Sequence, residues 1–175
     1  MKISTNPTIL GRRTTWFNLC LCLAFSVICM VMTANIFSSR FKFCGDGRLY
    51  KCLPFTLYLL DRWQTKPVVG NYYGFLARDT VFFDDGDLLA KRFDGHFLDH
   101  VQIGSNEDVL INGKAVVHGL QLAPRLNCQR SDFYGSAIIE KDEYFALGTT
   151  VDSYDSRYWG TVNETQIVGR LYPIF

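Results

Sequence analysis

The stretch GTTVDSYDSRYWGTV, from Gly148 to Val162, organises the interpretation of this chain. It combines serines, acids, an arginine and a Tyr-Trp-Gly end within a segment bounded by glycines. The stretch is too polar for a core strand, so it predicts an irregular loop over a site, since binding and catalytic groups collect on loops held by a rigid scaffold. If it stood alone, a surface turn whose Asp and Ser side chains cap their own backbone would be the better interpretation. It is accompanied by an apolar N-terminal segment, a Cys-x-Pro turn and a Lys-Arg pair.

The composition limits the architecture to one folded domain with an accessory segment. The chain has 175 residues, of which 48% are hydrophobic and 20% are charged, so it can bury one modest core. Its net charge is +1, and no dense block of Lys and Arg occurs. Because a nucleic-acid-binding protein needs such a basic footprint, we expect no nucleic-acid partner.

An uncharged segment near the N-terminus is long enough to cross a bilayer. Trp16–Phe37 holds no Asp, Glu, Lys or Arg, and as a helix it would span roughly 33 Å. Two arginines precede it, and leading positive charges favour an N-terminus in the cytoplasm. We therefore expect a cytoplasmic tail over residues 1–15, a transmembrane signal anchor over 16–37 and one β domain over 38–175.

A cleaved signal peptide is the alternative for this segment. The apolar core of a signal peptide is usually about 7–15 residues long, and the segment exceeds that length. Cleavage also requires small residues, yet at the small-residue exit near Ala34 one of those positions is occupied by Met32. Both observations favour an uncleaved anchor.

The rest of the chain carries strand and turn signals. Apolar, strand-like runs occur at Leu57–Leu60, Tyr144–Leu147 and Ile167–Leu171. Asn112-Gly113 lies between two β-branched runs, which is typical of a hairpin with a type I′ turn. No long helical periodicity is found outside the apolar segment, so the sequence predicts a mainly β fold.

Two connecting regions carry further expectations. The aromatic bursts NYYGF and TVFF, within residues 68–87, predict strands separated by tight turns. Phe41–Tyr50 is expected to be a short polar linker, because Gly45-Asp46-Gly47 marks a turn.

Four motifs resemble those of the type I signal peptidases, a family of serine-lysine peptidases, and more closely its conjugative-transfer branch, which processes pilins. CLPFTLY (52–58) matches the nucleophile turn, AKRFDGHFLDHV (90–101) the lysine box, VLINGK (109–114) a strand pair and GTTVDSYDSRYWG (148–160) the serine-aspartate-arginine box. The last motif is the most specific, whereas the lysine box has Phe97-Leu98 where Pro-Gly is usual. The resemblance implies a signal-peptidase-like β domain tethered by one transmembrane helix in the bacterial inner membrane, with the catalytic domain in the periplasm.

The resemblance implies catalytic and supporting roles at five positions. Cys52 takes the place of the nucleophile and Lys91 that of the general base. Ser153 takes the position of a serine that orients the lysine, and Asp155 and Arg157 those of an ion pair that supports the loop. A lysine acts as a base only as a neutral amine, and burial against apolar strands disfavours the ammonium form.

The nucleophile turn departs from the family pattern in two ways. The family nucleophile is a serine, whereas this chain offers a thiol, whose thiolate is the stronger nucleophile. Many members stabilise the oxyanion with a hydroxyl two residues before the nucleophile, and Tyr50 stands there. Pro54, in the same turn, is assigned with Tyr50 to the substrate and oxyanion side of the site.

Three cysteines outside the apolar segment leave the state of the thiol open. If Cys44 pairs with Cys128, Cys52 is free, and if Cys52 is bridged to either, the nucleophile position is blocked. His96 and His100 are four residues apart but lack a surrounding metal-ligand signature, so we expect no metal and no cofactor.

The implied function is cleavage of the leader from an exported precursor, such as a conjugative pilin, by a nucleophile-lysine dyad. The cut can end in hydrolysis or in cyclisation of the product. The expected partners are the precursor, the lipid bilayer and the conjugative transfer apparatus. The alternative is a catalytically degenerate scaffold protein of pilus assembly, in which a disulfide locks Cys52.

Overall fold

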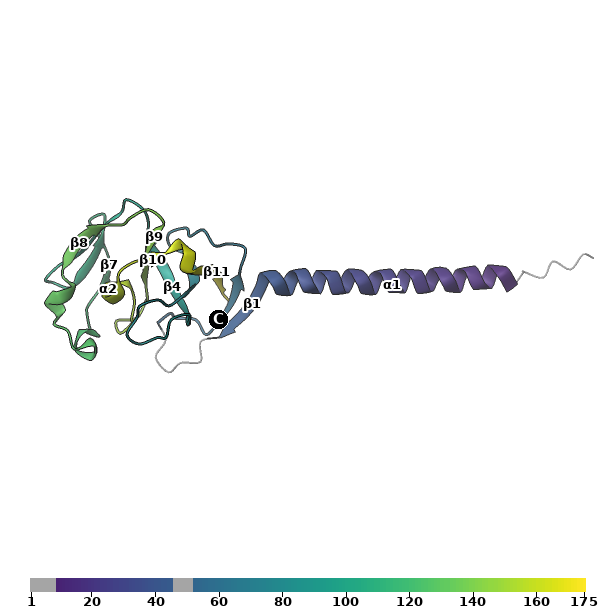
Figure 1. Ribbon diagram of the computed structural model, residues 1–175, viewed down its shortest axis with the longest axis horizontal. Coiled ribbons are helices and arrows are strands. Elements are labelled where there is room, and N and C mark those ends of the chain that lie inside the picture. The colour runs from purple at the N-terminus through teal and green to yellow at the C-terminus, as the bar shows by residue number, and fades with distance from the viewer. Residues whose placement is uncertain (1–8, 46–51) are drawn as a thin grey trace, which may run out of the picture. The chain divides into compact units, whose positions relative to one another are not determined.

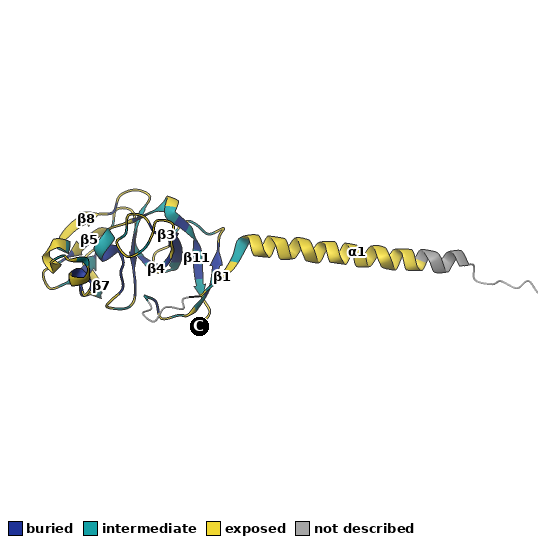
Figure 2. Ribbon diagram, turned by 60° about the horizontal axis from the view of Figure 1, so that its bottom comes forward, coloured by how far each residue is buried: buried dark blue, intermediate teal, exposed yellow. Residues whose placement is uncertain are grey.

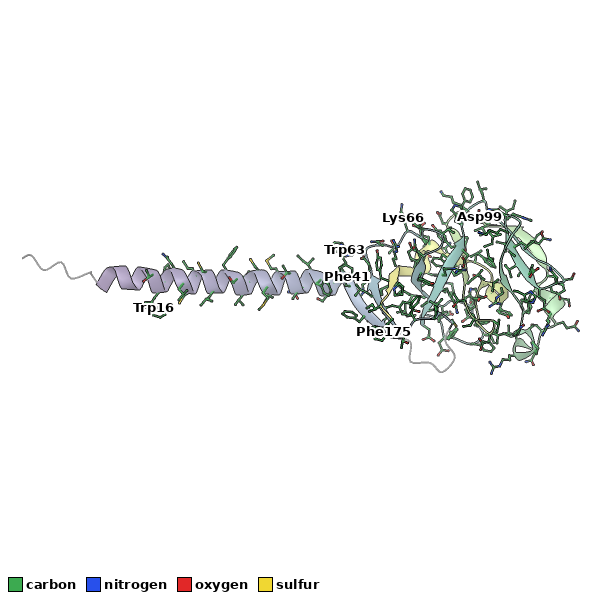
Figure 3. The ribbon with its side chains drawn as sticks, turned by 180° about the vertical axis from the view of Figure 1, so that it is seen from behind. Trp16, Phe41, Trp63, Lys66, Asp99 and Phe175 are labelled. Carbon is green, nitrogen blue, oxygen red and sulfur yellow. The ribbon has the colours of Figure 1, made fainter. Side chains whose placement is uncertain are left out.

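The computed structural model describes residues 9–45 and 52–175, which fall into two units divided after Arg40. The first unit contains one helix, α1 (Ile9–Arg40), whose stretch from Thr15 is long and apolar enough to cross a membrane. Figure 2 shows the part of this helix from Thr15 onward exposed nearly throughout, and in Figure 3 the side chains of this part, Trp16 among them, project on all sides. A signal sequence near an N-terminus would meet the same criteria of length and hydropathy.

The second unit, Phe41–Phe175, is built on two antiparallel sheets. The larger sheet has the order β1 (Phe41–Gly45), β2 (Leu57–Asp61), β11 (Ile167–Pro173), β3 (Tyr72–Leu76), β4 (Leu88–Gly95), β9 (Glu143–Leu147) and β10 (Val162–Asn163). The smaller sheet has the order β7 (Lys114–His118), β6 (Asp108–Ile111), β5 (His100–Ile103) and β8 (Gly135–Ile138). Figure 1 shows β7 and β8 at one end of the unit and β1 and β11 at the other. The prediction of a mainly β fold is confirmed.

Strand β4 carries the alternation that places a lysine in the core. Side chains alternate between the two faces of a strand, and in β4 the buried phase falls on Leu89, Lys91 and Phe93. Phe93 stacks on Tyr73 of β3 with ring centroids 5.2 Å apart. Lys91 therefore occupies a position that the pattern of its own strand assigns to an apolar residue.

Strand β9 joins the cores of the two sheets. Ala146 packs in the core of the larger sheet, whereas Phe145 and Leu147 pack against Val101 and Val109 of the smaller sheet. The loop that follows Leu147 consequently starts where the two cores meet.

The predicted hairpin is confirmed at the junction of β6 and β7. Asn112 and Gly113 have φ values of 52° and 78°, and the two strands pair antiparallel on either side of them. Positive φ at both central residues is what a type I′ turn requires.

Two expectations for the connecting regions were wrong. Phe41–Gly45 is strand β1 and pairs with β2, so the backbone of the expected linker is hydrogen-bonded in a sheet. Val81 and its neighbours form no strand, because the Val81 amide donates to the Tyr154 hydroxyl at 3.0 Å instead of joining a ladder. The stretch over residues 148–161 is irregular, as expected, apart from one helical turn, α2 (Ser156–Trp159).

Close packing of β11 on β2 yields a first prediction. A Cβ atom at Gly169 would overlap the backbone of Asp61, so Gly169→Ala should lower the free energy of unfolding by about 1–3 kcal/mol. The measurement is urea unfolding of the full chain in detergent, followed by circular dichroism. Gly45→Ala is the matched control, because its Cβ would meet no atom closer than 3.9 Å. Equal stability of the two variants would contradict this packing argument.

A carboxylate network holds the connection from β4 to β5 against the hairpin. Asp99, labelled in Figure 3, accepts from the His96 amide at 2.9 Å and from the Asn112 side chain at 2.7 Å. Burial alone would raise the pKa of Asp99, but these hydrogen bonds outweigh it and hold the pKa below its ordinary value of 3.8.

The lowered pKa gives a pH prediction with a definite sign. A carboxyl group with a depressed pKa in the folded state contributes stability above its unfolded pKa and loses that contribution as pH falls through the folded pKa. The difference in unfolding free energy between the wild type and Asp99→Asn should therefore narrow as pH falls from about 5 to about 3. Denaturant titrations at several pH values measure it, and a constant difference over that range would refute the role of the ionised carboxylate.

Candidate active site

The centre of the site is a hydrogen bond between two buried side chains. The Nζ atom of Lys91 donates to the Oγ atom of Ser153 at 2.9 Å. Lys91 is 2% exposed and Ser153 is not exposed at all. Among the described residues, no carboxylate forms an ion pair with Lys91, and the Trp159 ring lies with its centroid 6.0 Å from Nζ. The hydroxyl of Ser153 is therefore the polar partner of this buried amine.

A glycine allows the loop to approach this hydrogen bond. A Cβ atom at Gly148 would overlap the Ser153 side chain and lie 2.9 Å from the Cys52 carbonyl oxygen. The amide of Thr149 donates to that same carbonyl at 2.9 Å. The start of the loop is thus wedged between the serine and the turn that carries the cysteine.

A buried ion pair fixes the loop around Ser153. Arg157 donates to both carboxylate oxygens of Asp155 at 2.8 Å, and neither side chain is exposed. Arg157 also donates to the Ser153 carbonyl at 3.0 Å and to the Gly119 carbonyl at 2.7 Å, and Asp155 accepts from the Gly148 amide at 2.9 Å. Both charges are thus paired and hydrogen-bonded. The pair also binds three backbone groups, the carbonyls of Ser153 and Gly119 and the amide of Gly148, which hold the loop in place.

The charge of the guanidinium is stable in this network. Burial alone would lower the pKa of Arg157, but the hydrogen bond and the negative charge of Asp155 outweigh it and raise that pKa above its ordinary value. Arg157 therefore stays a cation throughout the pH range in which the protein is folded.

Cys52 and Lys91 line one cavity of about 360 Å³. Its wall is otherwise mainly apolar and includes Leu53, Tyr58 and Ala90. Cys52 is half-buried, so its side chain reaches the cavity from the turn before β2. A polypeptide whose side chains entered this cavity would pass beside both the thiol and the amine.

All six cysteines are free thiols in the structure. Cys44 lines the same cavity as Cys52, and burial raises the pKa of the Cys44 thiol, an effect that nearby Lys42 and Arg62 partly offset. Pro54 is exposed and does not line the cavity, and Tyr50 lies outside the described residues.

Two aromatic residues near the site escaped the motif analysis. Trp159 packs beside Lys91, and Tyr154 follows Ser153 directly and contacts Phe82 in a tilted arrangement with ring centroids 4.6 Å apart. Tyr154 also fixes the connection between β3 and β4 through its hydrogen bond with the Val81 amide. Their positions within the loop motif were visible in the sequence, but their partners are about 60 to 75 residues away along the chain.

Metal ligation finds no support in the described part of the chain, residues 9–45 and 52–175. No group of three or more His, Cys, Asp and Glu side chains comes together there in a way that could hold a metal ion. The groups that line the cavity include the amine of Lys91 and the thiols of Cys44 and Cys52.

Comparison with known proteins shows the family of this chain. The family model described as signal peptidase, peptidase S26 matches residues 75–175, which is more than half of the chain. The chain belongs to this family, and the predicted resemblance to the type I signal peptidases is confirmed at that level. The matched range contains Lys91, Ser153, Asp155 and Arg157 and begins after Cys52.

Two individual proteins are similar to this chain. Probable signal peptidase I-2 of Synechocystis sp. is 32% identical over 107 residues, which make up 55% of this chain and 46% of that protein. The chain thus spans about half the length of this curated relative. A crystal structure of a signal peptidase I from Enterococcus faecalis V583 has 22% sequence identity and a TM-score of 0.41, covering 61% of this chain and 97% of that one.

The buried ion pair gives a prediction that concerns folding alone. Arg157→Met should lower the free energy of unfolding by about 3–5 kcal/mol, because Asp155 would remain as a buried, uncompensated charge. Arg125→Met is the matched control, since Arg125 is exposed. Thermal unfolding of both variants beside the wild type measures the difference. Equal unfolding temperatures would show that the ion pair does not support the loop.

Proposed function

We propose that this protein is a membrane-anchored endopeptidase that removes the leader from an exported precursor by a dyad of Cys52 and Lys91. The observation that carries the proposal is the buried amine of Lys91, which is hydrogen-bonded to Ser153 and lines the same cavity as the thiol. Membership of the signal peptidase family supports the reaction class. The free state of Cys52 supports the thiol as nucleophile, because a disulfide would block the attack.

In the first half of the reaction, the neutral amine of Lys91 takes the proton of the Cys52 thiol. The thiolate attacks the carbonyl carbon of the scissile peptide bond and forms a tetrahedral intermediate. As the intermediate collapses, the carbon–nitrogen bond breaks and the Lys91 ammonium gives its proton to the departing amine. The products are a thioester on Cys52 and the free amino end of the mature chain.

In the second half, a nucleophile releases the thioester. Lys91 takes a proton from water, the hydroxide attacks the acyl carbon, and the thiolate leaves and regains its proton from the ammonium. An amine of the substrate itself gives a peptide bond and a cyclic product by the same route. Ser153 acts as a positioning residue in both halves, since its hydroxyl fixes the direction of the amine.

The substrate class is an exported precursor, and we propose a conjugative pilin on the strength of the four motifs. The mainly apolar cavity favours small or apolar side chains before the cut. The apolar helix α1 fits a membrane anchor, and the arginines before it favour a cytoplasmic N-terminus with the β unit in the periplasm. The conjugative apparatus is the corresponding partner.

Substitution of the dyad tests this proposal directly. Lys91→Ala should lower kcat/KM for precursor cleavage by about 10²–10⁴-fold, because general-base assistance is lost. Cys52→Ala should abolish cleavage, whereas Cys52→Ser should retain part of it. The measurement is the rate at which unprocessed precursor disappears in cells and with purified full-length enzyme.

Lys141→Ala, which removes an exposed lysine, is the matched control and should process precursor at the wild-type rate. Labelling the unreduced protein with a thiol reagent adds an independent readout, since a free Cys52 is modified and cleavage stops. Normal processing by Lys91→Ala would overturn the mechanism. A Cys52 that resists labelling in an active transfer system would favour the scaffold alternative.

A further inference from the structure

Strand β8 forms an open edge of the smaller sheet. It pairs with β5 on one side, and no strand among the described residues pairs with its other side. All four of its residues, Gly135–Ile138, are exposed. An open edge presents backbone groups that can pair with an added strand.

The hydrogen bonds between β5 and β8 show which backbone groups of β8 point outward. The Ile139 amide donates to the Asp99 carbonyl at 2.9 Å, so the backbone N–H of Ile139 points toward β5. The His100 carbonyl accepts from the Asn112 amide at 2.9 Å, so the backbone of His100 is hydrogen-bonded on the side of β5 away from β8. Hydrogen-bonded and non-hydrogen-bonded pairs alternate in an antiparallel ladder, so the pair of His100 with Ile138 is a non-hydrogen-bonded one. The N–H and C=O groups of Ser136 and Ile138 therefore point to the open edge.

An apolar groove of about 480 Å³ lies beside this edge. Gly135 and Ala137 pair with Ile103 and Val101, so they share the inward face of the sheet, yet both are exposed. Their small side chains leave the inward face uncovered, and Phe145 lines the opening. An added strand would direct alternate side chains into this space.

The charge of the groove restricts its occupant. Its lining includes the carboxylates Glu140 and Glu143 and no basic side chain. Glu143 already accepts from Asn163 at 2.7 Å, whereas Glu140 is exposed at the rim. The complementary ligand is an extended peptide with apolar side chains and a neighbouring lysine or arginine.

Strand β9 connects the groove with the candidate active site. Glu143 and Phe145 line the groove, and Gly148, directly after β9, packs against Ser153. Gly148 lies five positions after Glu143, which is about 17 Å in an extended chain. A polypeptide bound at the cavity needs about the same number of residues to reach the groove.

We propose that the β8 edge and its groove bind an extended segment of the exported precursor, outside the residues that enter the cavity beside Cys52. The segment pairs with β8 as an added strand, places an apolar side chain on Ala137 and sets a basic side chain near Glu140. This inference rests on the proposed function, because it takes the precursor as the polypeptide in the cavity.

The first experiment measures binding without cleavage. The probe is a fluorescent peptide of about ten residues in which valine and threonine alternate and one lysine stands at each end, matched to the strand period. Anisotropy is recorded with the full chain carrying Cys52→Ala in detergent micelles. Saturable binding is expected, and a peptide of the same composition with proline at every second position should not bind, because proline removes the pairing amides.

Three variants locate the binding. Ala137→Trp fills the groove, Ile138→Pro removes an outward N–H without removing a ladder bond, and Glu140→Lys reverses the charge of the rim. Each should weaken binding of the probe at least about tenfold. Gln102→Lys is the control, since it adds a lysine to the outward face of the same sheet, a charge change of +1, and should leave binding within about twofold.

The second experiment identifies the source of the segment. One substrate is a short peptide with small residues before the cut, and the other is that peptide extended on both sides by the probe sequence. With enzyme that retains Cys52, the groove variants should raise KM for the extended substrate about tenfold and leave kcat and all constants for the short substrate unchanged.

The outcomes separate this inference from the proposed function. If the probe does not bind, or if Ala137→Trp and Ile138→Pro leave its binding unchanged, the groove is not a peptide-binding site and the inference is overturned. If the probe binds but the KM values of both substrates are equal in every variant, the groove does not bind the precursor, and that part of the inference is overturned. If the wild type fails to cleave the short substrate, the proposed function itself is contradicted, whatever the probe does.

Discussion

One hydrogen bond, from the Lys91 amine to the Ser153 hydroxyl, is the constraint on which the β unit of this protein depends. Strand β4 sends Lys91 into the protein interior, where no carboxylate of the described residues forms an ion pair with it. The serine supplies the polar partner that such a group requires without supplying a charge. The hydrogen bond to this hydroxyl fixes the direction of the amine.

The loop after β9 exists to keep that hydroxyl in place. A four-residue helical turn has little stability of its own, so the fixed position of α2 comes from its partners. Asp155 and Arg157 neutralise each other and bind backbone groups of Gly148, Ser153 and Gly119. Buried ion pairs contribute specificity more dependably than net stability. Here the gain is one conformation of the loop, with the serine against the lysine and the first residue against the nucleophile turn.

The sequence predicted the parts of the fold that rest on local signals. The alternating and β-branched runs indicated the strands, and the Asn112-Gly113 turn was found because its positive φ values demand those residue types. The predictions were wrong where contacts with distant parts of the chain determine the local structure. Phe41–Gly45 is a strand only because β2 lies beside it, and the aromatic run around Val81 leaves the strand conformation because Tyr154 binds its amide.

The sequence by itself determined the family, the apolar segment and the residue types of the candidate site, because these follow from motifs and composition, which need no knowledge of contacts in space. Only the tertiary structure decided that Lys91 is buried, that Ser153 is its partner and that Cys52 shares its cavity. It also revealed the open edge of β8 and the groove behind it. These features depend on contacts between residues far apart in the chain. Sequence periodicity predicts which face of its strand a side chain occupies, but the residues that it contacts there belong to another part of the chain.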